Sequence, residues 1–119
     1  MKKKIVTLML AFIIILSLTA CGSKLSDSNT RIAESVVNAV DNYLDGYISV
    51  NTAYNTVCSA YESIDKTEDN DTDNMLFSTD VVLIESELGR QQINGSGDID
   101  YIIEKRNDIA KKAGLKKRR

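Results

Sequence analysis

The sequence predicts an all-α protein, a small antiparallel bundle of about four helices that follows a hydrophobic N-terminal segment. Beyond residue 29, apolar residues recur at steps of three and four in four separate stretches, which is the period of a helix that buries one face. The β-branched residues follow the same period and not the alternation typical of strands. The connections between the stretches are about two to ten residues long, which favours antiparallel neighbours.

The first two predicted helices are separated by a short glycine turn. Asn29 or Thr30 can cap the first helix, and Asp45-Gly46 can end it, because glycine suits the left-handed position that follows a helix. Ser49 is a suitable cap for the second helix. The apolar positions of the two stretches are Ile32, Val36, Val37, Val40, Tyr43, Leu44 and Tyr47, then Val50, Tyr54, Val57, Cys58, Tyr61 and Ile64.

The last two predicted helices are bounded by polar breaks. Residues 65–74 are charged and precede the third helix, which is expected to end near Gly89 or Ile93. The sequence NGSGD at 94–98 predicts a loop, with Asp98 as the cap of a fourth helix that ends at Gly114. The third helix has core positions at Phe77, Val81, Ile84 and Leu88, and the fourth at Ile99, Ile102, Ile103, Ile109, Ala110 and Ala113.

The N-terminal 20 residues have the three zones of a secretory signal peptide: a positive start, an apolar stretch and small residues at the exit. The positive charges are Lys2, Lys3 and Lys4, and residues 5–18 are apolar apart from two hydroxyl side chains. A membrane-spanning helix needs about 20 apolar residues, so this stretch is short for a permanent anchor.

Leu18-Thr19-Ala20-Cys21 resembles the lipobox of the bacterial lipoprotein class. The resemblance implies that a diacylglyceryl group is joined to the Cys21 sulfur and that a dedicated signal peptidase cleaves before this cysteine. It also implies a lipid-anchored protein on the extracytoplasmic face of the cell membrane, where two acyl chains give stable attachment. The alternatives are an uncleaved membrane anchor and a cysteine that follows a conventional signal peptide by chance. The segment DNYLDGYIS is also similar to small exported helical proteins of low-GC Gram-positive bacteria, a resemblance that implies no activity.

The predicted organisation has four parts. Residues 1–20 are the lipoprotein signal peptide, 21–29 the lipidated cysteine with a flexible tether, 30–114 the helical domain and 115–119 a basic tail. Because three of the 15 basic residues are lysines of the leader, the processed chain carries 12 basic and 17 acidic residues. The acid is concentrated before Tyr101 and the basic residues after it, so the body of the domain is expected to be acidic.

The composition argues against most familiar enzymes. The chain has no histidine, which removes the commonest general base and the commonest zinc ligand. We therefore expect a protein that is not an enzyme and holds no cofactor. An enzymatic alternative would need Glu85 or Glu87 to meet Asp41 or Glu34 in a cleft.

Cys58 and a row of three tyrosines that begins at Tyr47 each have two interpretations. If Cys21 is lipidated, Cys58 has no partner for an intramolecular disulfide, and it is either a reactive thiol or a small apolar residue of the core. Tyr47, Tyr54 and Tyr61 lie seven residues apart and could form a binding face. Packing is the favoured interpretation of both features, since all four residues lie on the apolar stripe.

An acidic segment resembles a calcium loop of the EF-hand or dockerin type. Counted from Asp69, the loop would have Asn74 at position 6, where glycine is needed for the sharp turn, and Phe77 at position 9, which the core requires. Acidic residues before a helix also favour its dipole without any ion. We therefore predict no metal site, and the candidate ligands are Asp69, Asp71, Asp73 and Asp80.

The basic C-terminus also has two interpretations. Its charges could contact anionic lipid headgroups or wall polymers, or they could form a solvated tail that offsets the acidic body. Nucleic acid is not an expected partner, because the chain is predicted to be exported. The residues concerned are Lys116, Lys117, Arg118 and Arg119.

These features together predict a membrane-anchored lipoprotein that binds an envelope protein or a peptide. The alternative is an immunity-type lipoprotein that sequesters a cationic peptide at the membrane, for which the acidic body would supply the attraction.

Overall fold

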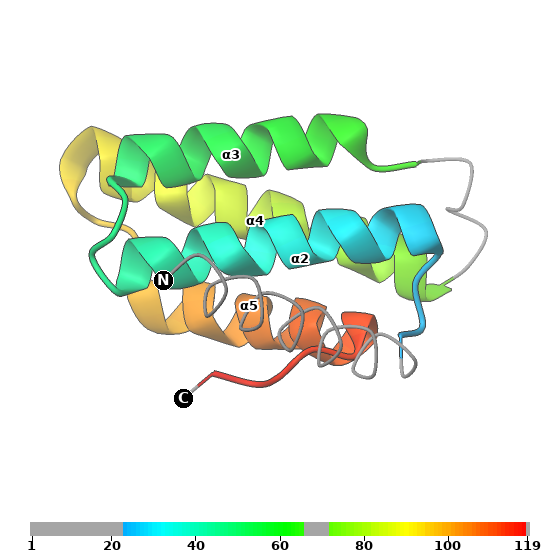
Figure 1. Cartoon of the computed structure of the whole chain (residues 1–119). Helices are drawn as coiled ribbons and strands as arrows, with labels where there is room; N and C mark the ends of the chain where they lie inside the picture. Colours follow the sequence, from blue (N-terminus) through cyan, green and yellow to red (C-terminus); the bar gives the residue numbers. More distant parts are fainter. Residues whose placement is uncertain (1–22, 66–71, 119) are drawn as a thin grey trace, which may run out of the picture.

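The computed structural model describes residues 23–65 and 72–118, and within them all regular secondary structure is helical. The helices are α2 (Asp27–Leu44), α3 (Val50–Ser63), α4 (Thr72–Asn94) and α5 (Ile99–Ala113), and they form an antiparallel bundle (Figure 1). The predicted all-α bundle of about four helices is therefore confirmed. The predictions for the signal peptide, the lipobox, Cys21, Asp69, Asp71 and Arg119 lie outside the described residues.

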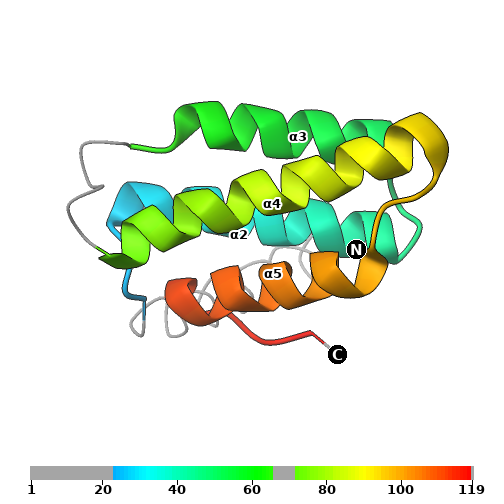
Figure 2. The same ribbon diagram turned by 180° about the vertical axis from the view of Figure 1, so that it is seen from behind.

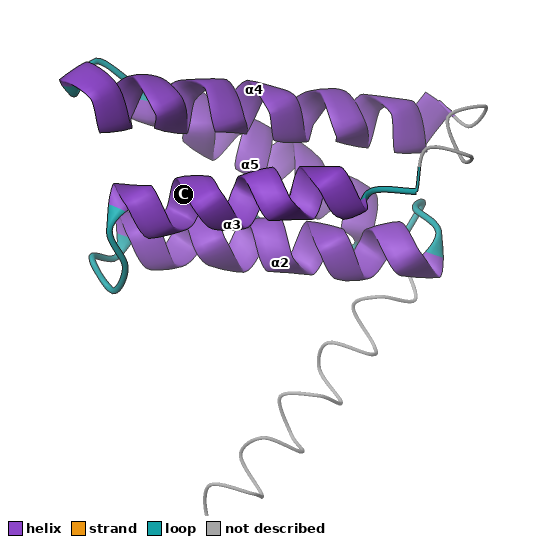
Figure 3. Ribbon diagram, turned by 90° about the horizontal axis from the view of Figure 1, so that it is seen from above, coloured by secondary structure: helices purple, strands orange, loops and turns teal. Residues whose placement is uncertain are grey.

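Each helix of the bundle packs against the next one in the chain, and α5 closes the bundle against α2 (Figure 2). The helices α2 and α4 therefore lie diagonally across it. Seen from above, α2 and α3 form one layer and α4 and α5 the other (Figure 3). The α2–α3 and α4–α5 connections share one end of the bundle, and the start of α2 lies at the opposite end (Figure 1).

Apolar side chains from all four helices fill the axis of the bundle. The predicted stripe of α4 is confirmed, because none of its four residues exposes any surface. Burial of each large apolar side chain contributes about 1.5–3 kcal/mol to folding. The fully buried apolar residues of greatest volume are Phe77, Ile84, Leu88, Ile102, Ile109, Val36, Val40, Val57 and Val81.

The tyrosine row is only partly a packing feature. Tyr54 and Tyr61 pack against the core, as predicted. Tyr47 is 79% exposed and lies in the α2–α3 turn, after the end of α2. The packing interpretation is therefore wrong for Tyr47, because the helical period that aligned the three residues is interrupted at Gly46, which has a φ of 82°.

Local chemistry sets most helix ends as predicted. The Ser49 side chain accepts a hydrogen bond from the Thr52 N–H, and the Asp98 side chain accepts one from the Tyr101 N–H. Gly114 ends α5 with a φ of 71°, in the left-handed region that favours glycine.

The start of α2 differs from the prediction. The cap is Ser26, whose Oγ accepts a hydrogen bond from the Asn29 N–H, and neither predicted cap, Asn29 or Thr30, is at the helix end. Asn29 instead is fully buried, where its Nδ2 donates to Asn74 Oδ1 at 2.8 Å and its Oδ1 accepts from the Asp65 N–H. This side chain therefore joins the start of α2 to the start of α4 and to the chain that leaves α3.

The flexible tether predicted for residues 21–29 is wrong from Ser23 onward. The Lys24 N–H donates to the Lys112 carbonyl at 2.7 Å, and the Ser23 and Thr30 hydroxyls lie 2.8 Å apart. Leu25 is only 8% exposed and belongs to the core. The folded body thus begins two residues after Cys21. In residues 23–65 and 72–118, no helix has both the length and the apolar character needed to cross a membrane.

Candidate functional site

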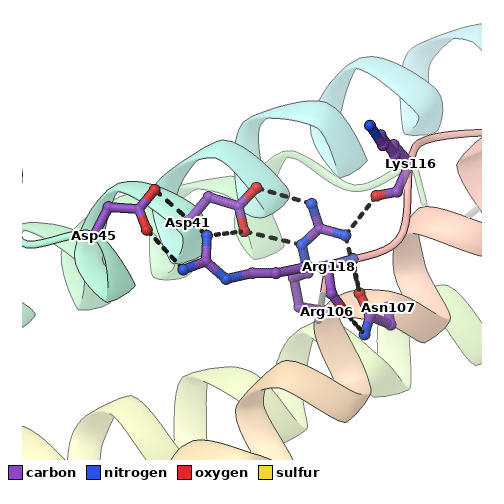
Figure 4. A network of polar contacts seen from close by, with 6 residues as sticks. All are labelled: Asp41, Asp45, Arg106, Asn107, Lys116 and Arg118. Atoms are coloured by element: carbon purple, nitrogen blue, oxygen red, sulfur yellow. Dashed lines mark hydrogen bonds and ion pairs between the residues drawn. The ribbon is translucent and has the colours of Figure 1, made fainter.

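Charged and amide side chains of α2 and α5 form a network that holds the C-terminal segment (Figure 4). The surface formed by Asp41, Asp45, Arg106 and Asn107 is called the α2–α5 groove. Gly114 reverses the chain after α5, and the Leu115 N–H donates to the Ala110 carbonyl at 2.7 Å. The segment then runs back along the bundle toward the end that carries the α2–α3 turn (Figure 1). Arg118 thereby reaches Asp45, the residue that caps the C-terminus of α2.

Arg106 of α5 is the centre of this network. Its guanidinium donates from Nε to Asp41 Oδ1 at 3.0 Å and from Nη2 to Asp41 Oδ2 at 2.8 Å, which is a bidentate pair across the α2–α5 interface. Its Nη1 donates to the Lys116 carbonyl at 2.7 Å and to Asn107 Oδ1 at 3.0 Å. Arg106 is only 5% exposed, so these bonds replace the water that the charge has lost.

Asn107, the next residue of α5, binds both backbone groups of Arg118. Its Nδ2 donates to the Arg118 carbonyl at 2.6 Å, and its Oδ1 accepts from the Arg118 N–H at 2.8 Å. The amide side chain therefore substitutes for the edge of a neighbouring strand and holds residue 118 in one orientation.

The Arg118 guanidinium completes the network on the α2 side. Its Nη2 lies 2.7 Å from Asp45 Oδ1, and its Nη1 lies 3.4 Å from Asp45 Oδ2 and 3.4 Å from Asp41 Oδ1. The hydrogen bond from Arg118 lowers the pKa of Asp45, and the same bond raises the pKa of Arg118. The two carboxylates thus hold the guanidinium of Arg118, while Asn107 holds the backbone of the same residue.

Comparisons of the chain with protein-family models, with curated proteins and with solved structures gave no match.

This geometry corrects the interpretation of the C-terminus as a solvated tail for residues 115–118. The Arg118 guanidinium is directed at Asp41 and Asp45 on α2. Contact of the four basic residues with a membrane surface stays a prediction. The Lys116 and Lys117 side chains are exposed. Arg106 and Asn107 were not among the predicted site residues.

The calcium loop considered for residues 69–80 is not compatible with the structure. The helix α4 begins at Thr72, so Asp73 and Asp80 lie on one helix and cannot wrap an ion as loop positions 5 and 12. Asp80 is buried and bonds to Lys112, whose Nζ is 2.9 Å away. In the described part of the chain, no three acidic or cysteine side chains converge in a manner that could hold a metal ion.

Two of the four carboxylates proposed for the enzymatic alternative, Asp41 and Glu87, have other contacts. Asp41 is bound to Arg106. Glu87 accepts a hydrogen bond from the Asp98 N–H at 2.8 Å and forms an ion pair with Arg90. The two residues lie on the diagonal helices α2 and α4, and each is bound to a different partner.

Cys58 is half-buried on α3 and is the only cysteine in the described part of the chain. Burial raises its pKa, and the negative charge of Glu85 acts in the same direction, although a hydrogen bond with Tyr54 opposes them. The thiol is therefore protonated at neutral pH, in contrast to the lowered pKa of reactive cysteines.

Two aspartates are expected to make opposite contributions to the pH dependence of stability. Burial raises the pKa of Asp80, so its contribution is fully present below about pH 4 and is lost as the pH rises through its folded pKa. The Arg118 bond lowers the pKa of Asp45, so its contribution is present above about pH 4 and is lost as the pH falls.

The test is to follow the free energy of unfolding of Asp80→Asn and Asp45→Asn by urea denaturation from about pH 3 to about pH 6. Relative to the parent, Asp80→Asn should gain stability as the pH rises, and Asp45→Asn should lose it. The same trend in both variants would show that these contacts do not set the two pKa values.

Proposed function

We propose that this chain is a lipid-anchored extracytoplasmic lipoprotein whose helical domain binds an envelope protein or a peptide. The proposal is carried by Leu18-Thr19-Ala20-Cys21 at the end of an apolar leader, immediately before a domain that is folded from Ser23. The buried apolar core of the described residues extends from Leu25 to Ala113, all of them after the predicted cleavage position.

The short distance between Cys21 and Ser23 supports a particular orientation of the domain. Two residues span at most about 7 Å, so a lipid on Cys21 would hold the start of α2 close to the membrane. The opposite end of the bundle, with the α2–α3 turn, would then point away from it. Tyr47 and Ile93 lie at that distal end, are 79% and 83% exposed, and are candidates for contact with a partner.

One observation favours the capture of a cationic peptide as the second candidate function. Asp41 and Asp45 already hold one guanidinium in the α2–α5 groove, and their helix belongs to the acidic part of the chain. A lipoprotein with such a receptor could bind an arginine-containing peptide at the cell surface before the peptide reached the lipid.

The lipid anchor is tested with Cys21→Ser in growing cells that receive a labelled fatty acid. We expect the variant to incorporate no label and to keep its leader, because the thioether that precedes processing cannot form on a hydroxyl. The matched control is Cys58→Ser, which removes the other thiol and should be labelled and processed like the parent. Continued labelling of Cys21→Ser would exclude this cysteine as the anchor.

A further inference from the structure

We infer that the α2–α5 groove is a recognition site for an extended, arginine-containing peptide and that residues 115–118 occupy it as an intramolecular ligand. The inference rests on the binding function proposed above and not on the lipid anchor. A peptide supplied by another molecule would bind once the chain's own C-terminus has left the groove.

The first part of the proposed recognition is contact with the peptide backbone. Arg106 donates to the carbonyl of residue 116 at 2.7 Å, and Asn107 pairs with the N–H and the carbonyl of residue 118 at 2.8 and 2.6 Å. None of these three bonds depends on the side chain of the bound segment. Any extended peptide can therefore make them, as in the β-type recognition of peptides by main-chain hydrogen bonds.

The second part is contact with one side chain, that of Arg118. Asp45 and Asp41 approach the Arg118 guanidinium from α2, and the planar fork of arginine can contact both carboxylates at once. A lysine would offer a single point charge at the same place. The groove is therefore expected to select arginine at the position of residue 118, whereas the exposed side chains at 116 and 117 are free to vary.

The receptor is held by contacts that do not involve the C-terminal segment. Arg106 is oriented by its bidentate pair with Asp41, and Asp45 is fixed at the C-terminus of α2, where its N–H donates to the Asp41 carbonyl. The ion pair between the segment and the end of α2 is more open, because the Asp45 side chain is 45% and the Arg118 side chain 26% exposed. Release of residues 115–118 is therefore expected to leave the groove formed.

Residues 115–118 are expected to compete with an added peptide for the same site. A segment joined to the groove through Gly114 has an effective concentration of about millimolar, which a free peptide in the micromolar range cannot match. The parent protein is thus expected to bind an added peptide weakly, and a variant with a repelled C-terminus is expected to bind it better.

The experiment uses the full chain with Arg118→Glu, in which the glutamate is repelled by Asp41 and Asp45. Fluorescence polarisation measures the binding of a labelled peptide GLKKRR, the sequence of residues 114–119, to this variant and to the parent. We expect the variant to bind at least about tenfold more tightly than the parent, because the intramolecular competitor is weakened. A peptide GLKKER, with glutamate at the position of Arg118, should bind at least about tenfold more weakly than GLKKRR.

Two further variants distinguish recognition in the groove from general attraction to an acidic protein. Asn107→Ala, added to Arg118→Glu, removes the two backbone contacts at the position of residue 118 without a change in charge and should weaken GLKKRR binding several-fold. Glu104→Gln on the exposed face of α5 removes one negative charge outside the groove and should leave binding nearly unchanged. Circular dichroism confirms that each variant is helical, and Arg118→Ala replaces Arg118→Glu if the latter does not fold.

Equal affinity of the parent and the Arg118 variant for GLKKRR, equal binding of the two peptides, or no effect of Asn107→Ala would overturn the inference. Such a result would leave the anchored binding protein with a partner elsewhere, for instance at Tyr47 and Ile93. Failure of the lipid anchor, in contrast, would appear in the labelling of Cys21 and would not alter peptide binding in solution.

Discussion

Phe77→Ala is expected to lower the free energy of unfolding by about 4 kcal/mol. Phe77 exposes no surface and is the largest fully buried side chain of the bundle. Its removal would leave a cavity among residues of the other helices, and the loss adds to the transfer free energy of the ring. Urea denaturation of the domain, followed by the helical circular dichroism signal, measures the change.

The matched control for Phe77 is Met75→Ala on the outer face of the same helix. Met75 is 47% exposed, so its truncation should change the free energy of unfolding by less than about 1 kcal/mol. Equal losses in the two variants would mean that α4 does not present Phe77 to the core.

Arg106→Ala is expected to lower the free energy of unfolding by about 3 kcal/mol. The substitution leaves Asp41 without its bidentate partner, and it removes the donor that binds the Lys116 carbonyl. Breaking a buried pair from one side is costly because the remaining charge stays partly desolvated. Arg106→Lys should recover only part of the loss, because an ammonium cannot reproduce the fork.

The control for Arg106 is Arg90→Ala, which breaks the pair with Glu87 at 3.3 Å. The Arg90 side chain is 64% exposed, so the loss should remain below about 1 kcal/mol. Similar losses for Arg90 and Arg106 would contradict a structural role for the buried network.

The core and most helix ends could be predicted from the sequence because both depend on local chemistry. The helical period places Phe77 and Leu88 on the inner face of α4, and the short polar side chains of Ser49 and Asp98 cap the next helices. The start of α2 was predicted too late because Leu25 and Ser26 precede the periodic stretch. The preceding Ser23 and Lys24 bond to the Lys112 carbonyl near the end of α5, and Ser26 bonds to Asn74 of α4, which the local pattern does not contain.

Arg106 shows which features of the candidate site can be predicted from the sequence and which cannot. The residue lies in register with Ile102, Ile109 and Ala113 on the inner face of α5, so the helical period alone places a charge where a partner is needed. The partner, Asp41, is 65 residues away in the chain, and only the packing of α5 on α2 identifies it. The bonds from Arg106 and Asn107 to residues 116 and 118 depend in addition on the reversal at Gly114.

Residues 69–80 resemble a calcium loop in the sequence, but the packing of α4 gives two of them a different role. Asn74 and Asp80 lie at positions of α4 that face the bundle, and both are buried. Asn74 accepts a hydrogen bond from Asn29, and Asp80 accepts one from Lys112. These contacts fix the two side chains within the bundle, where they cannot serve as ligands of one loop.

Intact-mass spectrometry of the protein extracted from its native membrane is the most direct measurement of the proposed function. Loss of residues 1–20 and a diacylglyceryl group on the new N-terminal Cys21 are expected. A chain that still begins at Met1, or a free thiol at Cys21, would contradict the lipoprotein proposal.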